Sequence, residues 1–365
     1  MLLGIALHAA MSFATVPLGW VVQDVGRHWS FDVLIGGIHG FRMQLFFFIA
    51  GFFGRLLGER LGAGGFLSNR LRRIGIPFVL GMVVLVPLMG WLWVWGMGGT
   101  SEVGVGAMRI PTAHLWFLQY LMIFYGVGVV VAGLGRWVPG GLLARADGLF
   151  ERWMRGGRVL ILLLPVTVLV LWGGPSLGEV GEVGGGFVPV PRALVYYGMF
   201  FGMGWWVQRC RVCLGSLEVG LKKGFAMAVV ALLVHWLVLA MGVKAGDPHF
   251  MVFKVVGLLG AAGYAWVMTF VATGWFSRFA ARPRRWMRYL ADASYWCYLI
   301  HLPLQMWMQI GVAKWPVNGW VKFAGINVVS MMILLLSYEW LVRYTWVGGV
   351  LNGRRVRGSG VTPGR

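Results

Sequence analysis

The sequence predicts an all-α protein, a polytopic integral membrane bundle of about ten transmembrane helices with both termini in the cytoplasm. Of its 365 residues, 59% are hydrophobic and only 12% are charged, and the mean hydropathy is +0.75. A soluble chain of this length has too little interior volume to bury so much apolar side chain. The apolar stretches are continuous and do not alternate with polar residues, which favours helices over barrel strands.

Ten apolar stretches have about the length that crosses a bilayer, ~20 residues for ~30 Å of hydrocarbon. They cover residues 1–22, 33–54, 74–96, 114–134, 158–173, 190–208, 224–243, 250–273, 289–312 and 320–346. Gly198 and Gly202 in the sixth stretch form a small-xxx-small pair, which favours close helix packing. We predict one membrane-embedded domain over 1–347 and a short, basic, disordered cytoplasmic tail over 348–365.

The basic residues indicate the orientation of these stretches. They gather in every second connection, and these segments hold 24 of the 32 Lys and Arg residues: 55–73, 135–158, 209–223, 274–288 and the tail after Leu341. The positive-inside rule places such segments in the cytoplasm. The net charge of +20 therefore reflects membrane orientation, and we expect no nucleic acid partner.

Two further features limit the functional class. The three cysteines Cys210, Cys213 and Cys297 cannot make a disulfide framework. Cys210-x-x-Cys213 has no second cysteine pair and no thioredoxin-like context, so we expect neither a bound metal nor redox chemistry at this pair. Met1 already lies inside an apolar run, without the basic region and cleavage site of a signal peptide. We therefore interpret this run as the first span and expect a further cytoplasmic segment before Met1.

Polar side chains at membrane depth carry the functional prediction, because an ionisable group there costs ~2.5–3.5 kcal/mol on insertion scales. His8 lies in the first span, with Ser12 one turn later and near enough to orient its imidazole. His8 is either a functional base or a side chain that bonds a neighbouring helix. His39 and Arg42 are three residues apart on one face of the second span, and Arg42 requires a carboxylate, backbone carbonyls or an anionic substrate.

Further polar groups lie near the ends of other spans. Arg70 and Arg73 precede the third span, where they serve either as membrane anchors or as a binding site for phosphates. His114 and Trp116 open the fourth span, and Trp116 also suits a membrane–water interface. Neither alternative is decided by the residues alone.

The ninth and tenth spans complete the set. Ser294, Tyr298 and His301 form one polar stripe. Pro303 should break the helix locally and free the carbonyl of Leu299. Glu339 is an acid inside the tenth span, where it is either the partner of an intramembrane Arg or a proton acceptor.

At these residues the sequence resembles the acyltransferase-3 family of integral membrane acyltransferases, most closely its glucan-biosynthesis branch. The matching stretches follow the family's order: Leu3–His8, Ile38–Gln44, Phe46–Gly51, Arg70–Pro77, His114–Leu118, Ala293–Ser294, Tyr298–Pro303 and Tyr338–Glu339. The chain departs from the family pattern at Ala50, where a Ser is usual. It also lacks the family's Asp-x-x-Arg-like stretch ahead of the first-helix histidine.

The resemblance implies about ten membrane helices and an acyl group that moves from a cytoplasmic acyl-CoA to an acceptor outside the cytoplasm. It implies His8 as the catalytic histidine and Arg70 and Arg73 as the paired arginines near the donor entrance. His39 and Arg42 match the second-helix motif of the branch. The expected partners are acyl-CoA, a glucan or other carbohydrate, and membrane lipid, with no tightly bound cofactor.

The residues and the resemblance together predict an O-acyltransferase of the bacterial inner membrane, with succinyl among the candidate acyl groups. His8 and Glu339 are the predicted catalytic residues. The predicted substrate-binding residues are His39, Arg42, Arg70, Arg73, His114, Trp116, Tyr298 and His301. A histidine suits general base catalysis near neutral pH, and arginines suit the phosphates of CoA and a developing oxyanion. Transfer is either direct or relayed through an acyl carrier.

The alternative function is a transporter or flippase of an anionic or glycan substrate, in which the same polar stripe binds the substrate without acyl chemistry. No inverted repeat is evident in the sequence, which disfavours this class. A purely structural role is disfavoured by the cost of several ionisable groups at membrane depth.

Overall fold

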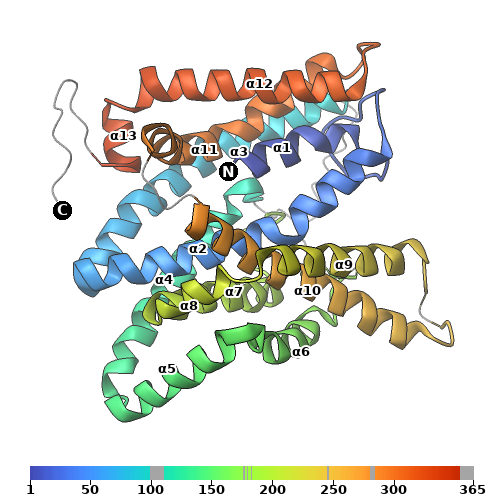
Figure 1. Cartoon of the computed structure of the whole chain (residues 1–365). Helices are drawn as coiled ribbons and strands as arrows, with labels where there is room; N and C mark the ends of the chain where they lie inside the picture. Colours follow the sequence, from blue (N-terminus) through green and yellow to red (C-terminus); the bar gives the residue numbers. More distant parts are fainter. Residues whose placement is uncertain are drawn as a thin grey trace. The chain divides into compact units, whose positions relative to one another are not determined.

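The computed structural model describes residues 1–98, 111–175, 177–178, 180–181, 183–244, 246–279 and 284–353. This part of the chain is helical and contains no strand. Its α-helices are α1 Leu2–Ala10, α2 Trp29–Arg70, α3 Ile76–Gly96, α4 Trp116–Leu134, α5 Gly140–Met154, α6 Val159–Leu171, α7 Pro191–Arg209, α8 Val212–Leu217, α9 Leu221–Ala240, α10 Phe250–Phe279, α11 Arg285–Val312, α12 Gly319–Ser337 and α13 Trp346–Leu351 (Figure 1).

Shorter 3-10 and π turns extend or connect these helices. The 3-10 turns are η1 Met11–Phe13, η3 Ala113–Leu115, η4 Gly135–Trp137 and η5 Arg155–Gly157. The π turns are η2 Leu71–Gly75 and η6 Tyr338–Val342. Nine of the ten predicted spans coincide with a helix, and most of their boundaries agree within a few residues.

The predicted first span, 1–22, is wrong in extent, because the helix ends at Phe13. Pro17 has no backbone N–H and disfavours helical backbone at the residue before it. Asp32 instead accepts hydrogen bonds from the amides of Thr15 and Val16, at 3.0 and 3.2 Å, which turns the chain away from a helical course.

The predicted cytoplasmic connection 55–73 is largely helical, because α2 continues to Arg70. An Arg55–Glu59 ion pair of 3.0 Å joins side chains one helical turn apart and supports this extension. Gly62 interrupts α2 with a φ of 67°, a left-handed conformation that favours glycine. The second predicted span therefore lies in the portion of α2 before Gly62.

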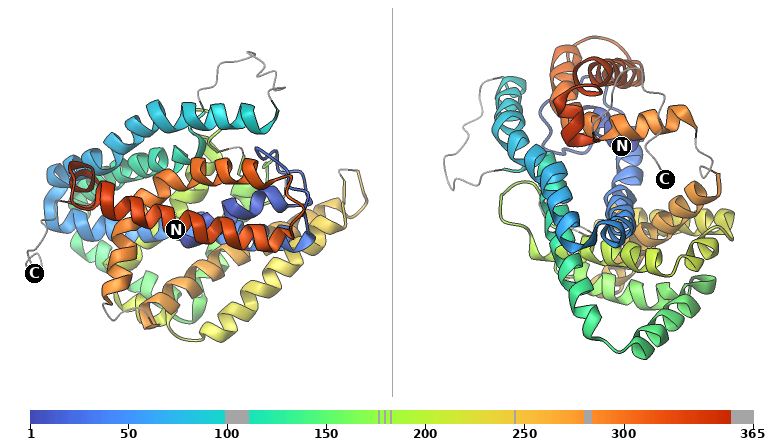
Figure 2. Two further views of the ribbon diagram at one scale, coloured as in Figure 1. Left: turned by 90° about the horizontal axis from the view of Figure 1, so that it is seen from above. Right: turned by 90° about the vertical axis from the view of Figure 1, so that its left-hand side faces the viewer.

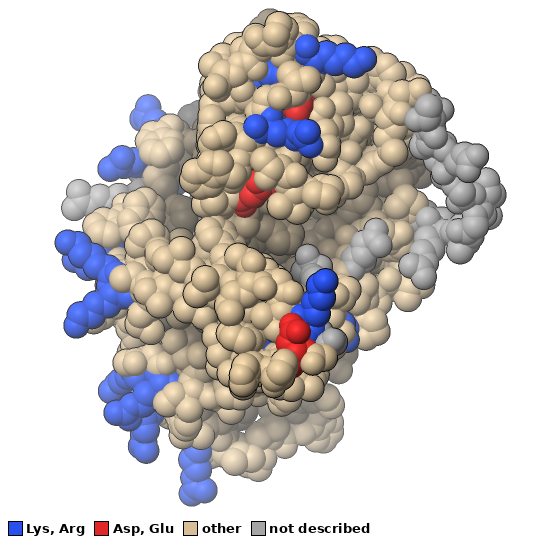
Figure 3. All heavy atoms as spheres, turned by 90° about the vertical axis from the view of Figure 1, so that its right-hand side faces the viewer, with Lys and Arg blue, Asp and Glu red and all other residues tan. Residues whose placement is uncertain are grey.

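Five helical stretches in the described residues are long and apolar enough to cross a membrane, and a sixth if the bent pair Gly140–Gly157 and Val159–Leu171 counts as one span. The stretch Trp29–Gly96 is one of the five, although it contains two of the predicted spans. The predicted count of ten is therefore not confirmed. Large apolar side chains stand exposed, among them Val83 at 69% and Leu169 at 72%, and most of the face in Figure 3 carries no charge. This surface suits contact with lipid.

The described helices form two compact units, each made of segments distant in the sequence. The first unit combines Met1–Ile38, Asn69–Leu118 and Pro283–Arg365. Within it, α11 packs against α1, α3 and α12, and α1 also packs against α12 (Figure 1). Ala9 and Ala10 are fully buried, so α1 comes close to its neighbours. The short α13 follows at an angle to α12 (Figure 2).

The predicted tail 348–365 begins inside α13, and its residues from Arg354 onward lie outside the described part of the chain. The prediction of disorder therefore concerns residues of which the structure says nothing.

The second unit combines His39–Ser68 and Gln119–Arg282. Within it, α10 packs against α6, α8 and α9. The predicted pair Gly198 and Gly202 does not mark a tight helix crossing, because a Cβ at Gly202 would meet nothing within 4 Å and one at Gly198 would lie 3.4 Å from the Phe124 ring. A close approach occurs two residues further along α7, at Gly204, where a Cβ would lie 1.9 Å from the carbonyl oxygen of Phe48 in α2. Only glycine allows this crossing of α2 and α7.

Candidate active site

Three of the predicted histidines meet in the first unit. The ring centroids of His8 in α1 and His301 in α11 are 5.3 Å apart, and those of His301 and His114 in η3 are 5.8 Å apart. Trp20 stacks on the His8 ring with centroids 5.9 Å apart and an angle of 19°. The fold therefore brings together imidazoles from three segments that lie far apart in the sequence.

A proline in α11 holds the His114 ring in place. Pro303 has no N–H to donate to the carbonyl of Leu299, four residues earlier, and His114 Nε2 lies 3.1 Å from that oxygen. The predicted free carbonyl is confirmed, but the predicted break is not, since α11 runs from Arg285 to Val312 through the proline. Tyr298 also donates its hydroxyl to the backbone oxygen of His114 at 2.6 Å.

His301 is held by its own helix. Its Nδ1 lies 2.7 Å from the carbonyl oxygen of Tyr298 and 3.1 Å from that of Cys297. Ser12 does not orient His8 as predicted, because its buried hydroxyl has no hydrogen-bond partner among the described residues. Ser294, predicted to share the polar stripe, bonds the carbonyl of Ala291 instead.

Two glutamines in α11 lie next to this site and were missed by the sequence reasoning. Gln305 donates to the carbonyl of Ile5 at 2.9 Å, and Gln309 donates to the carbonyl of His8 at 2.9 Å. Gln309 also accepts a 2.9 Å hydrogen bond from the indole of Trp20. Both residues continue the stripe of His301 at intervals of four, and this spacing is the signal that would have found them.

The predicted arginine pair lies at the π turn η2. Arg70 ends α2 and donates to the side chain of Asn69 at 2.8 Å, while the backbone oxygen of Arg73 accepts from the hydroxyl of Tyr295 at 2.8 Å. The two guanidinium groups are close enough to influence each other electrostatically. This pair presents two positive charges at the start of α3.

Glu339 and Trp116 are also in the first unit. The carboxylate of Glu339 forms an ion pair of 2.7 Å with Arg343, one helical turn later, so it is not joined to the three histidines. Trp116 is the first residue of α4 and is half-buried, with its ring centroid 6.4 Å from that of Phe117.

His39 and Arg42 both lie in the second unit. Their spacing predicts that they share one helix face, but the two side chains differ in burial. His39 is exposed, whereas Arg42 is 7% exposed and lies close enough to Tyr197 to affect its hydroxyl electrostatically. Gln44, a further residue that was missed, donates to the hydroxyl of Tyr196 at 3.0 Å. Arg42 is therefore set among polar side chains inside a helical unit.

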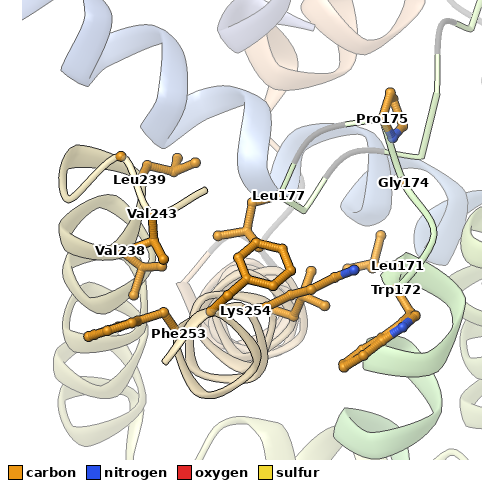
Figure 4. Close-up of a pocket in the computed structure, with 13 residues that line it drawn as sticks. Leu171, Trp172, Gly174, Pro175, Leu177, Val238, Leu239, Val243, Phe253 and Lys254 are labelled. Atoms are coloured by element: carbon orange, nitrogen blue, oxygen red, sulfur yellow. The ribbon is translucent and has the colours of Figure 1, made fainter. Parts of the chain in front are cut away.

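A cavity of about 350 Å³ lies elsewhere in the second unit (Figure 4). Its lining includes Trp172, Leu177, Val238, Phe253 and Lys254, with the Lys254 ammonium 4.5 Å from the centroid of the Trp172 ring. None of the predicted site residues lines it. In the described part of the chain, no three His, Cys, Asp or Glu side chains are placed to hold a metal ion.

Comparison with known proteins now identifies the class. A family model described as "Acyltransferase domain" matches residues 1–339. The chain belongs to this acyltransferase-3 family. It is a multi-pass membrane protein whose apolar helices fit that assignment.

Among curated proteins, the chain is similar to "Glucans biosynthesis protein C" of Salmonella gallinarum (strain 287/91 / NCTC 13346), with 29% identity over 151 residues. This match covers 38% of the chain and 37% of the relative. The protein of the same name from Salmonella schwarzengrund (strain CVM19633) is 29% identical over 141 residues, 35% of each chain. The match thus spans little more than a third of these relatives. No solved structure matches the chain.

Proposed function

We propose that this protein is a membrane-bound O-acyltransferase that moves an acyl group from a cytoplasmic acyl-CoA to a hydroxyl of an extracytoplasmic glucan or another carbohydrate. The family match supports acyl transfer, and the name of the matched relatives supports a glucan acceptor. The observation that carries the proposal is the position of His8, whose ring faces His301 and Trp20 in a group of three imidazoles. Succinyl is the acyl group that we would test first.

In this mechanism His8 acts as the general base. It takes the proton from the acceptor hydroxyl, whose oxygen attacks the thioester carbonyl. The new C–O bond forms, the C–S bond breaks, and the proton goes to the departing sulfur. The products are an ester and free CoA thiol.

The arginines have separate proposed roles. Arg70 and Arg73 supply the positive charge that the phosphates of CoA need. Arg42, buried in the other unit, suits a carboxylate or phosphate through its planar fork, and His39 accompanies it in the second-helix motif. We leave Glu339 outside the mechanism because Arg343 occupies its carboxylate.

We propose ten spans, with both termini in the cytoplasm of a bacterial cell and the protein in its inner membrane. The alternation of basic segments along the sequence supports this orientation. It would place the start of α3, with Arg70 and Arg73, on the side where acyl-CoA is made.

The test of the function is His8→Ala. We expect acyl transfer from radiolabelled acyl-CoA to glucan to fall by about 10²–10⁴-fold, as is typical when a general base is lost. Expression and thermal stability should be nearly unchanged, because alanine is an excellent helix former and α1 retains its backbone.

Ser294→Ala is the control in the same unit. Its hydroxyl donates to the carbonyl of Ala291 in its own helix, so its removal should leave activity intact. Near-normal turnover of His8→Ala would show that His8 is structural. Glycan movement across the membrane without ester formation would support the transporter instead.

A further inference from the structure

The hydrogen bonds of three side chains in the first unit fix which of their atoms carry hydrogen. His114 Nε2, His301 Nδ1 and Gln305 Nε2 each lie 2.7 to 3.1 Å from a backbone carbonyl oxygen. A carbonyl oxygen only accepts, so each of these nitrogens must be the donor. This assignment leaves no freedom in the tautomers of the two neutral rings or in the orientation of the amide.

The atoms that remain are acceptors. In the neutral rings these are His114 Nδ1 and His301 Nε2, and in the amide it is Gln305 Oε1. His114 Nδ1 and Gln305 Oε1 are buried and have no hydrogen-bond partner among the described residues. Gln305 itself has no exposed surface. Buried polar atoms of native proteins are nearly always paired, so two lone acceptors in one neighbourhood indicate a bound group.

These atoms belong to one neighbourhood around His8. Gln305 follows His301 by one turn of α11, and its amide bonds Ile5, three residues before His8. The His301 ring contacts both the His8 ring and the His114 ring. We call His114, His301 and Gln305 the acceptor-atom cluster.

We propose that the acceptor-atom cluster binds a neutral, hydroxyl-rich segment of the carbohydrate substrate, with His114 Nδ1 and Gln305 Oε1 each receiving a hydrogen bond from a sugar O–H. This inference rests on the proposed function and specifies the site that presents the hydroxyl to His8. A carboxylate or phosphate would bring only acceptor atoms against the lone pairs of the cluster. The cluster should therefore exclude anionic groups, which the arginines elsewhere in the chain are suited to bind.

The test measures sugar binding without any acyl donor, using the full chain in lipid nanodiscs. The probes are a neutral glucose oligosaccharide and the matching glucuronic acid oligosaccharide, which carries a carboxylate on each ring. We expect the neutral probe to bind at least tenfold more tightly than the acidic one. Gln305→Met should weaken neutral binding about tenfold, equivalent to about 1.4 kcal/mol.

Gln309→Met is the matched control, one turn further along α11. Both ends of the Gln309 amide are already used inside the protein, by Trp20 and by the carbonyls of His8 and Ala9. Its loss should lower the melting temperature without changing affinity for the neutral sugar. A side chain with only a structural role would give the same pattern at position 305.

Three results would overturn the inference: equal affinity in wild type and Gln305→Met, equal affinity for the two probes, or no binding of the neutral probe. Loss of acyl transfer alone would not. Sugar binding that persists in a protein with no acyl transfer would remove the proposed function and leave this site in place.

Discussion

At the scale of single residues, Cys210 and Cys213 show how burial alters side-chain chemistry outside the spans. Burial raises the pKa of Cys210 to about 12, and the nearby Asp147 carboxylate adds to the effect. Burial likewise raises the pKa of Cys213 to about 11. Only the thiolate reacts, and its fraction at pH 8 falls roughly tenfold for each unit by which the pKa rises.

We therefore expect the native protein to resist iodoacetamide at pH 8. Labelling of Cys210 and Cys213 should be at least about 100-fold slower than after denaturation, and it should accelerate only as the pH approaches 11. Mass spectrometry of a Cys297→Ala variant isolates the two sites. Rapid modification of the folded protein at pH 8 would contradict this expectation and revive a redox role for the pair.

Single residues also show what the sequence can reveal about the site. Pro303 predicts the free carbonyl of Leu299 because the absence of an N–H is a covalent property. The partner of that carbonyl, His114, depends on packing of α11 against a distant turn, which no local pattern encodes. Gln305 and Gln309 were overlooked because an amide carries no charge, although its burial needs partners just as strictly.

At the scale of elements, a buried ion pair fixes the segment between η1 and α2 to α12. The ammonium of Lys322 lies 2.5 Å from Asp24, and the two side chains are 3% and 1% exposed. Lys322 also donates to the carbonyls of Val312 and Trp315. We expect Lys322→Met to cost about 3–5 kcal/mol of stability, because it leaves the Asp24 carboxylate buried without a counter-charge.

The double variant Asp24→Asn with Lys322→Met is the control for this pair. It removes both charges, and the amide oxygen of Asn can still accept the hydrogen bond from Gly26. Thermal unfolding in lipid should show the double variant to be more stable than Lys322→Met alone. If the two variants unfold at the same temperature, the loss of the counter-charge to Asp24 has little effect on stability.

The extent of elements was predictable where apolar length was the only requirement. The stretch 74–96 agrees with α3 because an uninterrupted apolar run has one stable state in lipid. The stretch 1–22 failed because hydropathy does not register the turn at Pro17 or the bonds from Thr15 and Val16 to Asp32. The backbone restriction at Pro17 therefore ends the helix even though the stretch is apolar on average.

At the scale of the whole molecule, the proposed orientation can be tested with single cysteines. Ser68 and Val188 are exposed in the structure and lie in segments that we place on opposite sides of the membrane. An impermeant maleimide applied outside sealed cells should label Val188→Cys and not Ser68→Cys. The opposite pattern would invert the topology.

The division into two units was not predictable from composition. Each unit is assembled from segments that are not consecutive in the sequence, and no linker or change in apolar content marks the boundaries at Ile38 and Leu118. Predicted site residues fall into both units, with His8 in the first and Arg42 in the second. The order of these residues along the sequence does not reveal this division, because it arises from how the helices pack.

The missing N–H of Pro303 has a consequence for how the sequence can change during evolution. Any other residue at this position would restore a donor that competes with His114 for the carbonyl of Leu299. The imidazole would then lose the partner that fixes its tautomer, and a change at position 303 would be felt at position 114. During evolution, the proline and the histidine should therefore be kept or lost together. The effect of a mutation at either position depends on which residue stands at the other.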